Sequence, residues 1–282
     1  MTWELYRWAW RLESPLHIGA PPAGALNRTR LYVPARTLWG ALTAEIARRH
    51  SAGFPEYQAV GAQLQREARL SYLFPAELVG GRWRAWLPRY AEGEGLVWQR
   101  EEDSCSLEDR AFRARLLFSR PGTAIAPESD TAEEGTLREF DLLNPYWKDD
   151  NQALRPVAMV GYFFCRDERI IRLVEEVQEL FVGGDTRYGL GRLRRVAWDP
   201  ASAFFNGDPV DLRGDSPETR TSRALAHVEA AGSPEMRGAL ECIGGWDIAA
   251  GLISPTLAWA PGSVTTAPQS FRIQEDGRWR SG

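Results

Sequence analysis

The pattern of apolar and polar residues predicts a strand followed by a helix at the start of the chain. Residues 3–18 alternate large apolar with polar side chains and include a Ser-Pro pair, which is typical of a half-buried strand. A loop over residues 19–30 follows. Beyond Pro34 every fourth residue is apolar until the run breaks at Ser51-Ala52-Gly53, so a helix is expected there. Its apolar face consists of Leu38, Leu42 and Ile46.

The middle of the chain predicts strands and hairpins separated by acidic and glycine- or proline-rich loops. These strands are expected at residues 83–87, 113–118 and 137–142. A continuous apolar run at residues 157–164 predicts a buried strand, and Asp167 is then placed to cap a helix. The apolar face of that helix is formed by Ile170, Val174, Val177 and Phe181. A strand at residues 193–198 is expected after it.

Beyond residue 199 the pattern changes to loops and short strands, the last of them at residues 271–273. No low-complexity linker divides the chain. We therefore expect an α+β protein of two coupled units. Residues 1–199 would form the core with hairpin insertions, and residues 200–282 a strand-rich extension or a partial second unit.

Composition narrows the class of protein. A chain of 282 residues with 44% hydrophobic and 26% charged residues is ordinary for a soluble globular protein. No apolar run reaches the roughly 18 residues that span a bilayer, and the first residues lack the layout of a signal peptide, so a cytoplasmic protein with no membrane partner is expected. The three cysteines lie far apart without metal-ligand spacing, so neither disulfides nor a metal site is expected. No cofactor is expected either, because the glycine-rich stretch discussed below matches no nucleotide-binding motif.

Charge is unevenly distributed along the chain. A net charge of −4 argues against an indiscriminate nucleic-acid coat, yet the first 50 residues carry seven arginines and only three acidic residues. Residues 101–150 hold thirteen acidic and six basic residues. Lys148 is the single lysine, and arginine is the side chain whose planar fork matches phosphate oxygens, although a GC-rich genome explains this bias equally well. One face could therefore bind RNA while another faces solvent or a neighbouring protein.

The most informative local feature is the glycine-rich stretch at residues 183–192. Its glycines let the backbone approach a ligand closely, and its N–H groups can hold phosphate. It follows a helix, precedes a strand and lacks Gly-Lys-Ser/Thr, so it is neither a dinucleotide fingerprint nor a Walker motif. Arg187 and Arg192 add charge, and Tyr188 offers a face for base stacking. A purely structural turn with solvated arginines is an equally open interpretation.

The start of the first predicted helix is a second candidate phosphate site. Free N–H groups at a helix start attract phosphate, and Arg36 with the loop residues Arg28 and Arg30 would strengthen that field. Taken alone, these arginines are better explained as surface solubilisers. The twelve tryptophans, among them Trp3 and Trp8 in the first strand, are better explained by core packing than by a cofactor or sugar platform.

Candidate catalytic residues are scarce. Of the three histidines, His17 is the only one considered as a general acid or base for RNA cleavage, and a structural hydrogen bond is the better explanation of it. Ser/His/Asp triads and paired-histidine metal motifs are absent from the pattern. We therefore favour a protein that binds without catalysis.

The ordered set of motifs resembles the RAMP superfamily of CRISPR-associated RNA-binding proteins. The motifs are Ser-Pro-Leu-His-Ile-Gly at residues 14–19, Pro-Ala-Arg-Thr-Leu-Trp-Gly-Ala-Leu at residues 34–42, the Gly-x-Leu strand at residues 135–142 and the glycine-rich stretch. Their order is more specific than any one of them. The resemblance covers about the first 200 residues.

The resemblance implies a ferredoxin-like, RRM-like fold in which the glycine-rich loop lies against guide RNA. It thereby implies RNA contacts at Gly183, Gly184, Arg187, Tyr188, Gly189, Gly191 and Arg192. Repeated backbone members can cleave target RNA through an aspartate near the first helix, but residues 19–33 contain no acidic residue. Cleavage of target RNA by this chain is therefore in doubt.

The tail narrows the comparison to one kind of subunit. Gly-Gly-Trp-Asp-Ile at residues 244–248 and Ala-Pro-Gly-Ser-Val at residues 260–264 are similar to elements of the type III subunit that caps the five-prime handle of the guide RNA. The implied partners are guide RNA, other RAMP subunits and a large polymerase-like subunit. The alternatives are a guide-processing endoribonuclease that uses His17, a repeated backbone subunit, or an interaction module without RNA contact.

Overall fold

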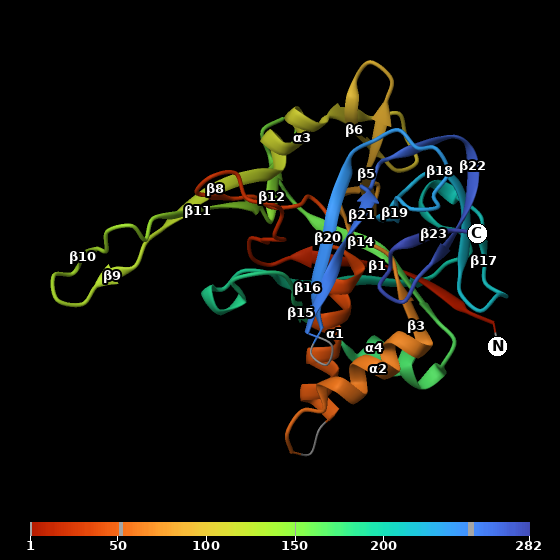
Figure 1. Cartoon of the computed structure of the whole chain (residues 1–282), viewed down its shortest axis with the longest axis horizontal. Coiled ribbons are helices and arrows are strands. Elements are labelled where there is room, and N and C mark those ends of the chain that lie inside the picture. Colours follow the sequence, from red (N-terminus) through yellow and green to blue (C-terminus); the bar gives the residue numbers. More distant parts are fainter. Residues whose placement is uncertain (1, 51–52, 150, 248–250) are drawn as a thin grey trace.

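The computed structural model describes residues 2–50, 53–149, 151–247 and 251–282, which form two large sheets with helices packed on the first (Figure 1). The first sheet has nine strands, and four of them form its centre. In spatial order these are β16 (Arg192–Pro200), β1 (Glu4–Leu12), β14 (Ala158–Cys165) and β4 (Phe74–Val79). Each is antiparallel to its neighbours.

Helices make the crossovers of this sheet. Between β1 and β4 the chain forms α1 (Ala35–His50) and α2 (Tyr57–Glu67), and between β14 and β16 it forms α4 (Glu168–Glu176). This strand order with these crossovers is consistent with a ferredoxin-like unit. The α+β class expected from the sequence is thereby confirmed. The first sheet is completed by β3 (Ala68–Leu70), β5 (Arg82–Ala91), β6 (Gly95–Arg100), β7 (Ser106–Glu108) and β15 (Glu179–Phe181).

An arm projects from the molecule between β7 and β14 and reaches the far left of Figure 1. Its base is a short sheet in which β11 pairs with β8 and with β2 from the loop after β1. The elements of this region are β2 (Leu26–Asn27), α3 (Asp109–Leu116), β8 (Leu117–Gly122), β9 (Ile125–Ala126), β10 (Thr131–Ala132), β11 (Arg138–Leu143), β12 (Tyr146–Lys148) and β13 (Leu154–Pro156).

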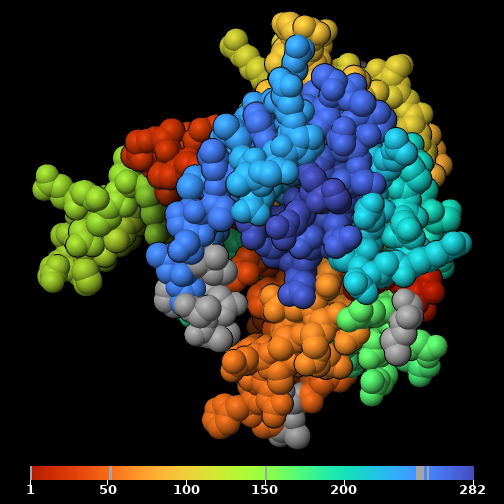
Figure 2. Space-filling model, turned by 45° about the vertical axis from the view of Figure 1, so that its right-hand side comes forward, coloured from red at the N-terminus to blue at the C-terminus, as the bar shows by residue number. Residues whose placement is uncertain are grey.

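The second sheet has seven strands and follows residue 200. In spatial order they are β17 (Val210–Asp211), β18 (Glu218–Arg223), β22 (Val264–Ile273), β23 (Trp279–Ser281), β19 (Val228–Glu229), β21 (Gly251–Trp259) and β20 (Leu240–Asp247). A Cβ on Gly277, in the turn before β23, would lie 2.0 Å from Ala35 Cβ at the start of α1. The two sheets are therefore in close contact, and Figure 2 shows the C-terminal residues (blue) directly against the region of α2 (orange).

The first strand is buried on both faces. Trp3, Trp8 and Trp10 are each at most 2% exposed, so the expectation that tryptophans pack in the core is confirmed for these three. Trp8 contacts Phe163 of β14 and Trp198 of β16 at ring-centroid distances of 5.5 and 5.6 Å. The expectation of a half-buried strand over residues 3–18 was wrong, because the strand ends at Leu12 and both of its faces are covered.

Other expectations need correction. Residues 113–118 were expected to form a strand, but most of them belong to α3, whose Phe112 and Leu116 are buried. Asp167 caps α4 as predicted, because its side chain accepts a hydrogen bond from Arg169 N. Phe181, however, lies beyond the end of α4 in β15 and is exposed. Helix α2 was not predicted, and the predicted break at residues 51 and 52 lies outside the described residues.

Candidate nucleic-acid interface

A cavity of about 710 Å³ lies where the two sheets meet α1. Five segments far apart in the sequence contribute most of its lining: the loop after β1, the first turns of α1, the glycine-rich loop, the strands β20 and β21, and the turn before β23. We call this cavity the groove. The residues that carry the argument below are Gly19, Arg30, Arg36, Gly40, Gly183, Gly184, His227, Cys242 and Arg278. Two segments that the sequence analysis singled out separately, the start of α1 and the glycine-rich loop, therefore meet at one site.

Backbone conformation explains several glycines of the glycine-rich loop. Gly183 has φ +87°, and a Cβ there would lie 2.2 Å from the carbonyl oxygen of His17. Gly184 N donates a hydrogen bond to that same oxygen at 3.0 Å. Gly191 has φ +76°, and a Cβ would lie 2.0 Å from Val182 O. These positions favour glycine because of the fold itself, which holds whether or not the loop also binds phosphate.

The predicted RNA contacts fall on two sides of the glycine-rich loop. Gly183 and Gly184 line the groove, and so do Arg30 and Arg36 from the other wall. Arg30 donates hydrogen bonds to Gly19 O and to Glu241 Oε2, the latter at 2.8 Å, so its charge is partly compensated. Arg36 also lies 5.7 Å from the ring of Trp39. The groove thus holds four of the ten candidates.

The other candidates lie outside the groove. Arg187, Tyr188 and Gly189 are exposed on the outer face of the loop, and Arg28 is exposed on the loop before α1. Arg192 pairs with Glu179 across β15 and β16 at 2.7 Å. Gly191 is buried. Their contacts with RNA remain predictions.

An aromatic and guanidinium stack connects the loop to the base of the arm. Arg138 of β11 lies 5.6 Å from the ring of Tyr188 and 5.3 Å from the ring of Phe140. Tyr188 is 68% exposed, so its ring is accessible to a base. The stack therefore brings charge and aromatic surface together beside the glycine-rich loop.

His17 is tied into this region by its neighbours. It is 8% exposed, and its Nδ1 lies 2.9 Å from Asp141 O in β11, so the N–H tautomer at Nδ1 can donate to that carbonyl. Its ring meets Phe140 edge-on at 5.5 Å. Since its own carbonyl accepts from Gly184, His17 links the glycine-rich loop to the arm. These contacts fit the structural hydrogen bond that the sequence favoured for His17, and a catalytic role stays the untested alternative.

Sequence reasoning missed a buried polar network at the inner wall of the groove. Tyr72 Oη lies 2.7 Å from His227 Nδ1, and His227 Nε2 lies 3.3 Å from Glu241 Oε2. Burial alone would raise the pKa of Glu241, but hydrogen bonds from His227 and Arg30 and the charge of Arg30 outweigh it and lower the pKa to about 2. Residues that are 155 positions apart in the chain meet here, and no local motif announces such a pairing.

Burial also fixes the protonation state of His227. It lowers the pKa of His227 from the ordinary 6.5, and the opposing hydrogen bond to Glu241 does not fully compensate. A neutral imidazole can accept a hydrogen bond from Tyr72 at Nδ1 and donate one to Glu241 from Nε2. The network therefore joins the two sheets through a neutral histidine.

Because His227 is neutral in the folded protein, we expect acidification to destabilise the protein. Because the pKa of His227 is lower in the folded state, the unfolded chain takes up a proton more readily, and stability is lost as pH falls below about 6.5. We expect denaturant titrations at pH 7.5 and 5.5 to show a smaller free energy of unfolding at the lower pH, and His227→Gln to reduce this difference. An unchanged difference in the variant would contradict the assignment to His227.

Two further findings concern metals and membranes. Among the described residues no group of three or more His, Cys, Asp and Glu side chains is placed to hold a metal ion. Within the same part of the chain, no helix is both long and apolar enough to cross a membrane.

The fold has known counterparts. The sequence matches no protein-family model and no curated protein. The structure is similar to a chain in a cryo-EM structure of type III-B Cmr-beta bound to cognate target RNA and AMPPnP, with a TM-score of 0.57, 14% identity, and coverage of 92% of this chain and 85% of the other. A second structure, of Cmr-beta bound to cognate target RNA, gives a TM-score of 0.55 with the same identity and coverage. At this identity the likeness shows a shared fold.

Proposed function

We propose that this protein is a subunit of a type III CRISPR effector complex and binds guide RNA in the groove. The observation that carries the proposal is that the start of α1 and the glycine-rich loop both line one cavity. The start of α1 presents the first turn of a helix and Arg36, and the glycine-rich loop presents the backbone of Gly183 and Gly184; helix starts and glycine backbone are both suited to phosphate. The fold shared with a chain of Cmr-beta complexes supports the same role.

The charge of the groove supports an anionic ligand. Its lining includes Arg30, Arg36 and Arg278 together with Asp276, which pairs with Arg278, and Arg30 pairs with Glu241 at the inner wall. Three arginines against these two carboxylates leave one positive charge in excess at the groove, whereas the protein as a whole has a net charge of −4. A local positive site on an acidic protein favours one defined RNA path over general coating of nucleic acid.

The finer role follows from the tail motifs. We propose that the bound segment is the five-prime handle of the guide RNA, and that the neighbours are other RAMP subunits and a large polymerase-like subunit. Gly244 and Gly245 of the first tail motif line the groove, and a β-bulge lies between Ile243 and Gly245. Ile248 of that motif lies outside the described residues. Co-purification with these neighbours would test the assembly.

Salt-dependent RNA binding tests the proposal. Short repeat-derived RNA should bind in a filter assay, and affinity should fall steeply between 50 and 200 mM salt because arginine binding to phosphate releases counterions. The variant Arg36→Ala/Arg278→Ala, at two arginines that line the groove, should weaken binding about tenfold and flatten the slope by roughly one unit for each arginine–phosphate pair removed. Arg187→Ala/Arg192→Ala tests the outer face of the loop in the same way.

The control variant removes equal charge elsewhere. Arg169 and Arg172 on α4 are exposed and paired with Asp167 and Glu168, and neither lines the groove. Arg169→Ala/Arg172→Ala should leave both affinity and slope close to wild type. Absent binding, or binding that is indifferent to salt, would favour an interaction module instead.

A further inference from the structure

Neither backbone conformation nor packing within the protein explains why residue 40, inside α1, is a glycine. It is the sixth residue of α1 (Ala35–His50) and does not have a positive φ, so the backbone there does not require glycine. Glycine in a helix interior is less favourable than alanine because it loses more conformational freedom on folding. Something else must therefore compensate for its presence.

Packing within the protein does not supply that reason. A Cβ on Gly40 would meet no heavy atom of the protein within 4 Å. The contrast is Gly61 of α2, where a Cβ would lie 2.8 Å from Trp39 Cζ2 and 3.3 Å from Thr43 Cγ2. Gly61 is required for the packing of α2 on α1, whereas the space beside Gly40 is open.

The open space beside Gly40 belongs to the groove. Gly40 lines it on the α1 side, next to Arg36, and Gly19 lines it from the loop after β1. Gly19 also lacks a positive φ, and a Cβ there would meet nothing within 4 Å. Two glycines that the fold does not require thus keep side chains out of the same cavity.

We propose that the ribose-phosphate backbone of the bound strand passes over α1 in van der Waals contact at Gly40. The inference rests on the proposed function and specifies it, because it names the point of closest approach. Three arginines line the cavity, two of them paired with Glu241 and Asp276, and the remaining excess of positive charge fits a polyanion better than a neutral peptide. A contact between helix backbone and sugar-phosphate is also independent of base sequence.

The test separates clearance for a ligand from packing. Gly40→Ala should melt at or above the wild-type temperature and bind repeat-derived RNA about tenfold more weakly, and Gly40→Leu should bind more weakly still. Gly61→Ala should differ in stability, with a melting temperature below the wild-type value, because its Cβ would clash with Trp39. A destabilised Gly40→Ala would show that the space is not open and would overturn the proposal.

A native cysteine reports where the RNA lies. Cys242 is exposed and lines the groove, while Cys105 is half-buried and does not line it. RNA should slow alkylation of Cys242 by iodoacetamide in the wild type and leave Cys105 unaffected, and Gly40→Leu should abolish this protection.

Different results would contradict the contact at Gly40, the choice of RNA as the ligand and the proposed function itself. If the wild-type protein binds RNA with the expected salt dependence but Gly40→Leu binds equally well, the contact at Gly40 is wrong while the proposed function stands. If Gly40→Leu binds RNA normally but no longer joins its neighbouring subunit, the cavity seats a protein segment instead. If the wild-type protein binds no RNA, the proposed function itself fails.

Discussion

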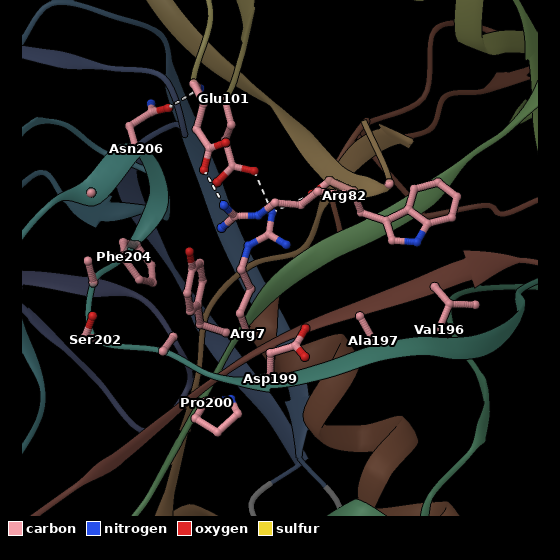
Figure 3. A pocket seen from close by; sticks show the side chains of 17 residues that line it. Arg7, Arg82, Glu101, Val196, Ala197, Asp199, Pro200, Ser202, Phe204 and Asn206 are labelled. Atoms are coloured by element: carbon pink, nitrogen blue, oxygen red, sulfur yellow. Dashed lines mark hydrogen bonds and ion pairs between the residues drawn. The ribbon is translucent and has the colours of Figure 1, made fainter. Parts of the chain in front are cut away.

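Replacing Arg7 with methionine should lower the free energy of unfolding by about 3 to 5 kcal/mol, which is the cost of leaving a buried charge without its partner. Arg7 Nη2 lies 2.7 Å from Glu101 Oε2, and the two side chains are 8% and 4% exposed. Arg7 also donates to Trp83 O at 2.7 Å. Both side chains line a cavity of about 540 Å³, and Figure 3 shows the guanidinium of Arg7 meeting Glu101 at its wall.

Two further variants show that the destabilisation comes from the unpaired charge. Arg82 pairs with Glu102 at 2.8 Å in the same cavity, but the side chains are 55% and 40% exposed, so Arg82→Met should cost less than about 1 kcal/mol. Arg7→Met/Glu101→Gln should recover at least half of the stability that the single variant forfeits. Urea titrations measure all three. Equal destabilisation at Arg7 and Arg82 would contradict the argument from burial.

This ion pair also shows why the first strand was misjudged from sequence. A polar residue between apolar ones predicts a solvent-facing position, yet Arg7 is 7% exposed and its partner lies 94 residues away. The alternation of β1 correctly predicted a strand. It could not reveal that both faces are covered, because that depends on segments distant in the sequence, such as those that bring Trp83 and Glu101 against Arg7.

The helices differ in how clearly the spacing of their apolar residues predicts them. In α1 the apolar positions recur over four turns, and the predicted face is the buried one. In α2 only Gly61 and Leu64 are buried, so too few apolar residues define a period. The segment of α3 is short and reads Arg-Ala-Arg-Leu at residues 113–116, which fits strand alternation as well as a helical turn.

Parts of the candidate site could also be predicted from the sequence, and other parts could not. Local composition was enough to pick out the glycine-rich loop and the start of α1, because glycine, arginine and a helix start each have a local signature. Their meeting in one groove depends on the second sheet closing the cavity through β20 and β21. The network of Tyr72 and His227 depends on the same closure, so nothing near either residue in the sequence indicates it.

The glycine-rich loop should tolerate alanine at Gly189 much better than at Gly183. Gly183→Ala should lower the free energy of unfolding by about 2 to 5 kcal/mol, because the new Cβ adds a backbone clash to the strain of a left-handed conformation. The clash is with His17 O at 2.2 Å, at φ +87°. Since that oxygen also accepts from Gly184 N, relief of the clash must move the loop, and RNA affinity should fall with it.

Gly189 provides the matched control. Its φ of +82° is nearly the same, but a Cβ there would meet nothing within 4 Å. Gly189→Ala should therefore cost only the conformational strain, about 1 to 2 kcal/mol, and leave RNA affinity near wild type if the groove side of the loop makes the contact. Denaturant titration and filter binding on both variants measure the two effects separately. A fall in affinity in Gly189→Ala that matches Gly183→Ala would move the contact to the outer face, where Arg187 and Tyr188 are exposed.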